Sequence, residues 1–321
     1  MAKTLTILPF LVLVFACQPD ASLQPAPVKI LSDTATSLVI LGTTQDGGWP
    51  HIGCRKTCCD SIQKAGLPPG KVVALGLCDP LHQQTFLFEA TPDITSQLSA
   101  FMSSLPFRQT STPTGIFLTH AHIGHYSGLM YLGREALNAD AVPVYAMPAM
   151  TQFLQNNGPW NQLLRLNNIQ LQTLKADSSV FLNKALTVIP LRVPHRDEYS
   201  ETVGFVIKGK YKSALFIPDI DKWNRWDRSI EQLIHEVDYA FLDATFFDGA
   251  EIKHRAMSEI PHPFVVESLK RFEGLPLSDK QKIYFIHFNH SNPLLYEHSV
   301  QTKQVKKAGY HVAREGMCFT L

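Results

Sequence analysis

Three histidines, His120, His122 and His125, lie within six positions, directly after the short apolar run 115–118. Imidazole nitrogens bind Zn²⁺ or Fe²⁺ at about 2.0 to 2.1 Å, and a turn between a strand and a helix gathers closely spaced ligands more easily than a regular element does. A single histidine would be more typical of a core or surface position, and a chance cluster is the alternative for all three. The spacing predicts a metal site.

The elements that must position these side chains alternate along the chain. Short β-branched runs predict strands, and longer amphipathic stretches, several of them opened by Pro or Asp, predict helices. The expected strands are 37–42, 72–78, 85–89, 115–118, 142–146, 185–191, 202–208, 214–218, 239–242 and 283–286, and the expected helices are 94–104, 125–137, 148–156, 227–236, 263–273 and 293–308. This mixture predicts an α/β protein in which helices cover sheets, with residues 37–321 forming one domain.

The histidine cluster resembles the signature H-x-H-x-D-H of the metallo-β-lactamase superfamily. Further segments that resemble landmarks of that superfamily follow in order across 37–321, namely 86–93, 193–197, 215–219 and 285–289. The resemblance implies a four-layer αββα sandwich with a metal site at one edge, between the two sheets. It also implies a first metal bound by His120, His122 and His195, and a second bound by His125 and His287, with Asp219 bridging the two.

One ligand of this signature is missing, because Gly124 stands where the superfamily has its Asp. We therefore expect one firmly held metal with an open position for water, and a weakened or empty second position. Alternatively, a carboxylate from another part of the chain takes the place of the missing Asp as a ligand of the second metal. Asp46 is a candidate, although Asp before Gly-Gly is often a turn residue. His290 is another, although it could equally be an edge or supporting residue.

The expected chemistry follows from the metal. Zn²⁺ lowers the pKa of a bound water to about 7 and polarises a carbonyl or phosphoryl oxygen, so hydrolysis is the first expectation. Asp219 would orient that water or accept its proton. Asp197 and Asp243 are candidates for carboxylates that hold the imidazoles in place through hydrogen bonds, and a surface or capping role is the alternative for each.

Within the superfamily, the chain resembles the branch of the pyrroloquinoline quinone biosynthesis protein B. The similar segments are 42–50, 89–94, 287–293 and 316–321. That branch implies a Cys-rich structural zinc loop, for which the candidate ligands here are His51, Cys54, Cys58 and Cys59. A disulfide between Cys54 and either Cys58 or Cys59 is the alternative in an oxidising compartment, and vicinal cysteines do not easily face one ion.

The amino-terminal segment resembles a bacterial lipoprotein signal. Lys3 precedes the apolar run 7–16, which is too short to span a bilayer, and Cys17 with its polar successors follows. We predict a signal peptide over 1–16, lipidation at Cys17, and a flexible tether over 17–36. An ordinary cleavable signal is the alternative. Either signal predicts export. With the lipid at Cys17, the protein is a membrane-anchored lipoprotein in the periplasm or at the cell surface.

The balance of positive and negative charge indicates which kinds of molecule the protein binds. Lys and Arg number 29 against 28 Asp and Glu in the 321 residues, so the formal net charge is +1. Such a balance does not favour a nucleic-acid binder and leaves a small-molecule substrate, with membrane contact only through the lipid at Cys17. The sequence does not indicate an oligomeric state.

Three functions remain as hypotheses. The first is an exported zinc hydrolase that acts on an ester, amide, lactone or phosphodiester. The second is a role in quinone-cofactor biosynthesis, where iron in the same ligands would support oxygenation. The third is a non-catalytic metal-binding lipoprotein. Export fits the cofactor-biosynthesis hypothesis poorly, because a peptide-derived cofactor is assembled where its precursor is made. The presence of all three histidines, His120, His122 and His195, argues against a non-catalytic protein.

Overall fold

The computed structural model describes residues 30, 32, 34–107, 111–252 and 255–321. Within them the chain forms two seven-stranded sheets. The first contains β1 (Ser37–Gly42), β2 (Ala74–Asp79), β3 (Gln84–Phe88), β4 (Gly115–Phe117), β5 (Val142–Ala146), β6 (Ile169–Thr173) and β14 (Cys318–Thr320), in the order β14-β1-β2-β3-β4-β5-β6. The strands from β14 to β3 pair antiparallel, and those from β3 to β6 pair parallel.

The second sheet mirrors this mixed arrangement. It contains β7 (Val180–Phe181), β8 (Thr187–Arg192), β9 (Val203–Lys208), β10 (Ser213–Ile217), β11 (Tyr239–Asp243), β12 (Ile283–Ile286) and β13 (His311–Val312), in the order β13-β12-β11-β10-β9-β8-β7. Neighbours from β7 to β10 are antiparallel, and neighbours from β10 to β13 are parallel.

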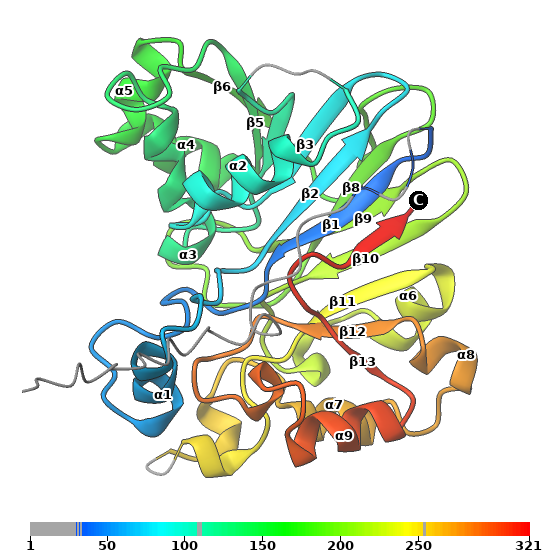
Figure 1. Ribbon diagram of the computed structural model, residues 1–321. Helices are drawn as coiled ribbons and strands as arrows, with labels where there is room; N and C mark the ends of the chain where they lie inside the picture. Colours follow the sequence, from blue (N-terminus) through cyan, green and yellow to red (C-terminus); the bar gives the residue numbers. More distant parts are fainter. Residues whose placement is uncertain (1–29, 31, 33, 108–110, 253–254) are drawn as a thin grey trace, which may run out of the picture.

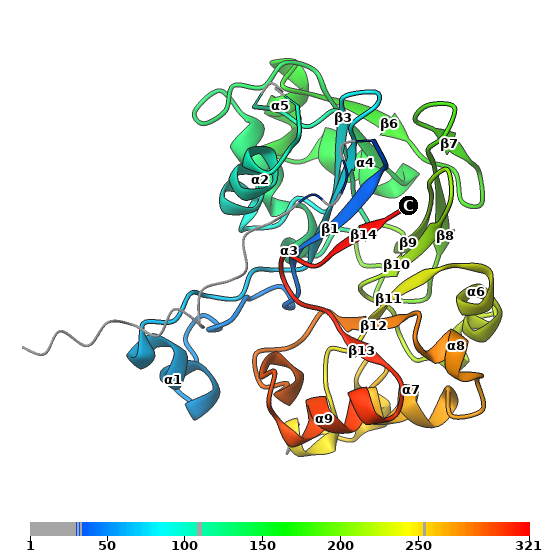
Figure 2. The ribbon, with the colours of Figure 1, turned by 45° about the vertical axis from the view of Figure 1, so that its right-hand side comes forward.

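Helices cover the outer face of each sheet (Figures 1 and 2). Beside the first sheet lie α2 (Ile94–Ser103), α3 (Ile123–Tyr126), η2 (Ser127–Leu132), α4 (Pro148–Asn156) and α5 (Trp160–Arg165). Beside the second lie α6 (Ile230–Glu236), α7 (Val265–Arg271), α8 (Leu277–Lys280) and α9 (Val300–Lys307). This is the four-layer αββα sandwich. The remaining helix, α1 (Thr57–Ala65), lies to one side of these layers.

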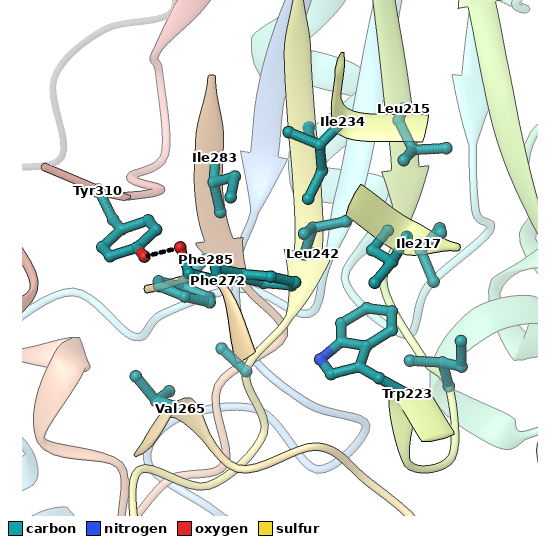
Figure 3. Close-up of a cluster of buried hydrophobic side chains, with 14 of the residues drawn as sticks. Leu215, Ile217, Trp223, Ile234, Leu242, Val265, Phe272, Ile283, Phe285 and Tyr310 are labelled. Carbon is teal, nitrogen blue, oxygen red and sulfur yellow. Dashed lines mark hydrogen bonds between the residues drawn. The ribbon is translucent and has the colours of Figure 1, made fainter. Parts of the chain in front are cut away.

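Three apolar clusters hold the layers together because the central strands are buried on both faces. Between the sheets, Phe88, Phe117, Phe205, Phe216 and Phe241 lie in one cluster. A second cluster joins the first sheet to its helices, and a third joins the second sheet to α6, α7 and α9. Figure 3 shows part of the third cluster, where the Tyr310 hydroxyl also donates a hydrogen bond of 3.1 Å to the Phe272 carbonyl.

The predicted elements correspond closely to the central strands and the longer helices. The ranges 37–42, 142–146, 148–156 and 283–286 coincide with β1, β5, α4 and β12. The predicted helix at 125–137 is instead the short α3 and the 3₁₀ turn η2, and the one at 293–308 is split into η6 (Pro293–Leu295) and α9. The sequence analysis missed α1, α5, α8, β6, β7, β13 and β14.

The predicted signal peptide at 1–16, the lipidation residue Cys17 and most of the 17–36 tether lie outside the described residues. Among the residues that are described, no helix has the length and hydropathy needed to cross a bilayer.

One edge of the sandwich collects the ends of several strands that run in the same direction. β3 and β4 are parallel, as are β10, β11 and β12, and β8 runs the same way as β10 because both pair antiparallel with β9. Binding residues of mixed α/β sheets gather beyond the carboxyl ends of such strands. The predicted ligands follow these strands.

Candidate metal centre

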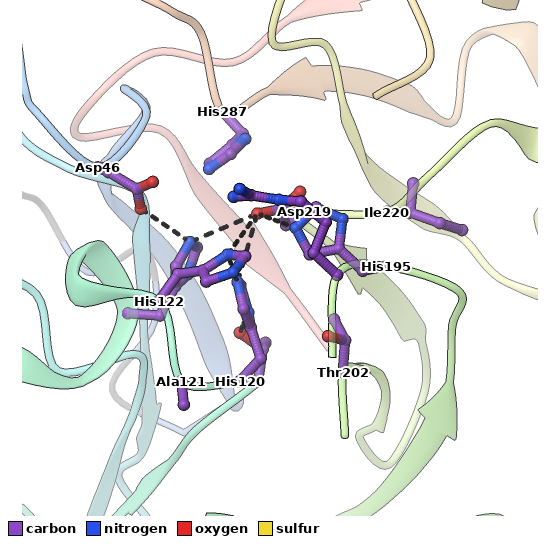
Figure 4. Close-up of polar contacts among 12 residues, drawn as sticks. Asp46, His120, Ala121, His122, His195, Thr202, Asp219, Ile220 and His287 are labelled. Atoms are coloured by element: carbon purple, nitrogen blue, oxygen red, sulfur yellow. Dashed lines mark hydrogen bonds and ion pairs between the residues drawn. The ribbon is translucent and has the colours of Figure 1, made fainter. Parts of the chain in front are cut away.

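The first cluster contains His120, His122, His195 and Asp219, whose ligand atoms all lie within 4.8 Å of one another. His120 and His122 follow β4, His195 follows β8 and Asp219 follows β10. His120 Nε2 is 3.4 Å and His195 Nε2 is 3.3 Å from Asp219 Oδ2, and Figure 4 shows these side chains turned toward one point. Three histidines separated along the sequence therefore converge as predicted.

The spacing of these atoms suits a metal ion. Two ligands at about 2.05 Å from one tetrahedral ion lie roughly 3.3 Å apart. The distances of His120 Nε2 and His195 Nε2 from Asp219 Oδ2, 3.4 and 3.3 Å, match this value, whereas His120 Nε2 and His122 Nδ1 lie closer to each other, at 2.7 Å. His195 Nε2 is buried and has no hydrogen-bond partner. Because buried polar atoms are almost always paired, an unpartnered ring nitrogen that faces this cluster fits a cation.

A second cluster adjoins the first and contains Asp46, His125 and His287. Asp46 Oδ1 is 3.3 Å from His125 Nε2, which in turn is 3.8 Å from Asp219 Oδ2. The atoms Asp46 Oδ1, His125 Nε2 and His287 Nε2 are buried and have no hydrogen-bond partner. This second cluster therefore has a carboxylate beside two histidines even though residue 124 is Gly.

Two residues of the centre have unusual backbone geometry directly after a strand. His287 follows β12 with φ +67°, and Glu89 follows β3 with φ +82°. This left-handed region is unfavourable for residues with a side chain and is found preferentially at functional sites. The abrupt turn at His287 ends β12 where its ring enters the centre.

Hydrogen bonds fix the orientation of the imidazoles. Glu89 contacts His125 Nδ1 at 3.1 Å and accepts a hydrogen bond of 2.6 Å from the Thr119 hydroxyl, which lies 2.9 Å from His120 Nδ1. On the solvent side, His122 Nε2 lies 3.1 Å from Glu198 Oε2. Such supporting carboxylates set which ring nitrogen faces the metal.

The sequence analysis proposed Asp197 for this supporting role, and the structure places it elsewhere. Asp197 accepts hydrogen bonds from the Thr202 hydroxyl at 2.9 Å and from Arg192 at 3.3 Å. Its neighbour Glu198 contacts His122 instead. Consecutive residues of an extended loop point in different directions, so the choice between two adjacent carboxylates could not be read from spacing.

Asp243 does lie behind the ligands, at the end of β11. It accepts a hydrogen bond of 2.7 Å from the Thr245 hydroxyl, which lies 2.9 Å from His287 Nδ1. It also lies 2.9 Å from Nδ1 of His262, a residue that the sequence analysis missed. His262 Nδ1 is 3.1 Å from Asp219 Oδ1, so this ring joins Asp219, Asp243 and His287 in a further group of ligand type. Only its Pro-flanked position, His262-Pro263 before a helix, marked it in the sequence.

Burial and charge separate the protonation states in the centre. Burial and the charge of His125 hold the pKa of His120 well below its usual range, which leaves the neutral imidazole that binds metals. Burial opposes ionisation of Asp219, but the charges of His195 and His262 hold its pKa well below normal. Burial disfavours the charged form of His262, yet Asp243 and Asp219 raise its pKa to about 10.

The cysteine loop forms a separate cluster at α1. Cys54, Cys58, Cys59 and His290 lie together, and the Cys54–Cys58 and Cys58–Cys59 Sγ distances are both 4.0 Å. Sulfurs bound to one tetrahedral zinc at about 2.3 Å lie roughly 3.8 Å apart, far beyond the length of a disulfide bond. The three are free thiols, so neither proposed disulfide is formed.

The fourth member of the cysteine cluster is His290 rather than the predicted His51. The His51 ring lies against the His290 ring with centroids 4.5 Å apart, and His51 Nδ1 contacts the Ile52 carbonyl at 2.8 Å. Burial and the nearby His51 and Lys56 lower the pKa of His290 to about 4, so its ring is neutral. His290 therefore belongs to this cluster and not to the second metal position considered for it.

The family model described as "Beta-lactamase superfamily domain" matches residues 84–288 of this chain. These residues include every histidine of the two adjoining clusters. The chain belongs to the β-lactamase superfamily. The coenzyme PQQ synthesis protein B of Cupriavidus necator is 27% identical over 315 residues, covering 88% of this chain and 98% of that protein. This similarity supports the PqqB-like branch of the superfamily.

Solved structures of the superfamily share the fold. A zinc-bound PqqB from Methylobacterium extorquens has a TM-score of 0.75 at 22% identity and covers 89% of this chain and 100% of its own. A diphosphatase of the PhnP family has a TM-score of 0.64 at 20% identity and covers 90% of this chain and 98% of its own. This β-lactamase superfamily member therefore shares its two-sheet fold with both of these structures.

Proposed function

We propose that this protein is a metal-dependent enzyme of PqqB type that acts in the synthesis of a quinone cofactor. The observation that supports metal dependence is the convergence of two histidine clusters on one buried carboxylate, Asp219. The role in cofactor synthesis is supported by similarity to a coenzyme PQQ synthesis protein over 98% of that protein's length. Iron in these ligands would support oxygenation with dioxygen as the oxidant.

Hydrolysis is the second candidate, and a specific feature favours it. The first cluster keeps all three histidines beside a carboxylate, and a diphosphatase shares the fold. Zinc bound there would acidify a water and polarise a carbonyl or phosphoryl oxygen of an ester, amide, lactone or phosphodiester.

The chain's own residues have the same tasks in either reaction. His120, His122 and His195 would hold the first ion, and His125 and His287 the second. Asp219 stays ionised between them, so its carboxylate can orient a bound water or accept a proton. His262 holds a proton at Nδ1 between Asp219 and Asp243 and thereby keeps the Asp219 carboxylate oriented.

Complementation separates the two candidates. A bacterium that lacks its own PqqB should regain the activity of a quinone-dependent dehydrogenase when it produces this protein, and not when it produces His195→Ala. If no activity returns while zinc-loaded protein cleaves a phosphodiester or lactone, hydrolysis is the function. If neither occurs although metal is bound, the chain is a metal-binding protein without catalysis. Counting zinc and iron in protein purified without added metal identifies the native ion.

We further propose that the cysteine cluster binds a structural zinc through Cys54, Cys58, Cys59 and His290. Such a site would link α1 to the segment directly after β12. Cys59→Ser should lower the zinc content by one equivalent and leave the His-bound ion in place, whereas His195→Ala should do the reverse.

Export, suggested by the segment before residue 18, is a separate proposal that belongs with the hydrolytic candidate. Labelled fatty acid should enter the wild-type protein in bacteria and not Cys17→Ser, and the membrane fraction should contain the protein. A quinone precursor peptide is made inside the cell, so a lipidated protein would favour the hydrolytic candidate. Unlabelled protein in the soluble fraction would contradict lipidation, and its recovery from the cytoplasmic rather than the periplasmic extract would contradict export.

A further inference from the structure

We infer that Asp46 supplies the carboxylate ligand of the second metal position, and that residue 124 is glycine because the Asp46 loop fills the space of a side chain there. This inference rests on the metal-dependent function proposed above. It assigns a ligand from the loop after β1 to a position that the signature fills from the histidine segment itself.

The first step is steric. A Cβ added at Gly124 would lie 2.1 Å from Asp46 Oδ1 and 2.6 Å from Asp46 Cα. Both distances are far below any real contact, and the second involves backbone, which cannot rotate away. Glycine at a close backbone approach is the residue that permits it. The Asp46 loop therefore lies where the missing side chain of residue 124 would begin.

The second step concerns what holds the loop there. Gln45 N donates a hydrogen bond of 2.8 Å to the Phe288 carbonyl, and Phe288 N donates one of 2.8 Å to the Thr43 carbonyl. Phe288 directly follows the ligand His287. The backbone thus fastens Asp46 and His287 to each other, so both reach the second position as one unit.

The third step excludes a turn role for the carboxylate. A turn aspartate accepts hydrogen bonds from backbone amides close to it in the sequence. The turn here is closed by Gly48 N and the Gln45 carbonyl at 2.8 Å. Asp46 Oδ1 instead forms an ion pair with His125 Nε2 at 3.3 Å, across the chain, and accepts no hydrogen bond from a nearby backbone amide. A buried carboxylate oxygen beside two unpartnered imidazole nitrogens is the donor set of a metal position.

The test is metal titration, which needs no substrate. Zinc is titrated into metal-free protein against a chelating indicator, and Co²⁺ absorption reports coordination. Asp46→Asn, which keeps the size of the side chain, should weaken one equivalent at least tenfold and leave the others unchanged. Asp140→Asn, an exposed carboxylate on another loop, is the matched control. Circular dichroism verifies that each variant is folded.

Variants at residue 124 test the steric step. Gly124→Ala removes no ligand, yet it should weaken the same equivalent because Asp46 must move. Gly124→Asp restores the carboxylate of the signature and should nevertheless weaken that ion. Gly274→Ala, where a Cβ meets nothing within 4 Å, is the control and should bind like the wild type.

Unchanged zinc binding by Asp46→Asn, or tighter binding by Gly124→Asp, would overturn the inference. A protein that shows the expected zinc losses but catalyses neither reaction would leave this ligand assignment intact and contradict only the proposed function.

Discussion

At the scale of single residues, Glu198 and Asp197 offer a matched pair. Glu198 contacts the outer nitrogen of His122, whereas Asp197 binds Thr202 and Arg192. Supporting carboxylates of metal-binding histidines commonly contribute 10- to 100-fold in affinity. We expect Glu198→Gln to weaken the first ion about tenfold in a chelator competition and Asp197→Asn to leave it unchanged. Equal effects of the two variants would contradict the assignment.

His262 supports two buried carboxylates in the metal-free protein. Asp219 and Asp243 are 2% and 0% exposed, and His262 contacts both. Removing one partner of a buried charge pair costs about 3 to 5 kcal/mol, because the remaining charge is left uncompensated. His262→Ala should lose stability of this order in denaturant unfolding without metal, and zinc should restore part of it. The exposed His298→Ala is the control.

The members of the two histidine clusters could be recognised as candidates in the sequence because they fall in a short signature and at strand ends. His262, Glu198 and the supporting role of Glu89 could not be assigned, because their partners lie far away in the sequence. Whether the carboxylate of a loop residue faces an imidazole ring or the solvent depends on the backbone conformation of the loop, which the sequence pattern does not give. His290 replaces His51 for the same reason, since its position follows from the turn after β12.

At the scale of elements, the cysteine cluster should control the order of α1. Trp49 Nε1 donates a hydrogen bond of 2.8 Å to the Cys58 carbonyl, and its ring meets that of Tyr296 edge-on at 5.4 Å. Removal of zinc with a strong chelator should therefore shift Trp49 fluorescence toward the red, because the ring gains solvent. Cys59→Ser should show the shifted spectrum without chelator, and Trp49→Phe should lose the response.

The contact of α6 with α8 and with Lys282, the residue before β12, predicts a pH dependence. Lys282 Nζ is 2.8 Å from Asp279 and donates to the His235 carbonyl at 2.9 Å. The Lys282 hydrogen bond lowers the pKa of Asp279 from its ordinary 3.8. The resulting stability is therefore present above about pH 4 and is lost as the pH falls through the lower folded-state pKa.

Lys282→Met tests this dependence. Its unfolding free energy should lie below that of the wild type at neutral pH, and the difference should narrow in acid. The exposed Lys303→Met is the control, and a difference that grows in acid would contradict the assignment.

The central strands could be predicted because both of their faces are buried, which gives continuous apolar runs. The missed strands β7 and β13 have only two residues each, too few for a periodic signal. The predicted helix at 293–308 is split because the Asn292 side chain accepts from Leu294 N and the Ser299 side chain accepts from Thr302 N, so two starts replace one. An N-cap depends only on residues next to it in the sequence, so Asn292 and Ser299 could have been recognised as the starts of two separate helices.

At the scale of the whole molecule, the layer between the sheets carries the stability. Phe216 is fully buried in that layer, 6.3 Å from the Phe88 ring, whereas Phe181 in β7 is 76% exposed. Truncating a buried Phe to Ala typically costs about 3 to 5 kcal/mol. Denaturant unfolding should show a loss of this order for Phe216→Ala and little change for Phe181→Ala. Similar losses in both would contradict the assignment of the core.

Because β14 pairs with β1, β1 is synthesised long before its outer neighbour in the sheet. Ile40 N donates to the Met317 carbonyl and Leu321 N to the Thr36 carbonyl, both at 2.9 Å, so the outer neighbour of an early strand is translated much later than that strand. Until the ribosome has passed residue 320, a nascent chain presents an open strand edge that can pair with another polypeptide. Products stalled short of that point should accumulate as aggregates, and their rescue should depend on a chaperone that covers β1.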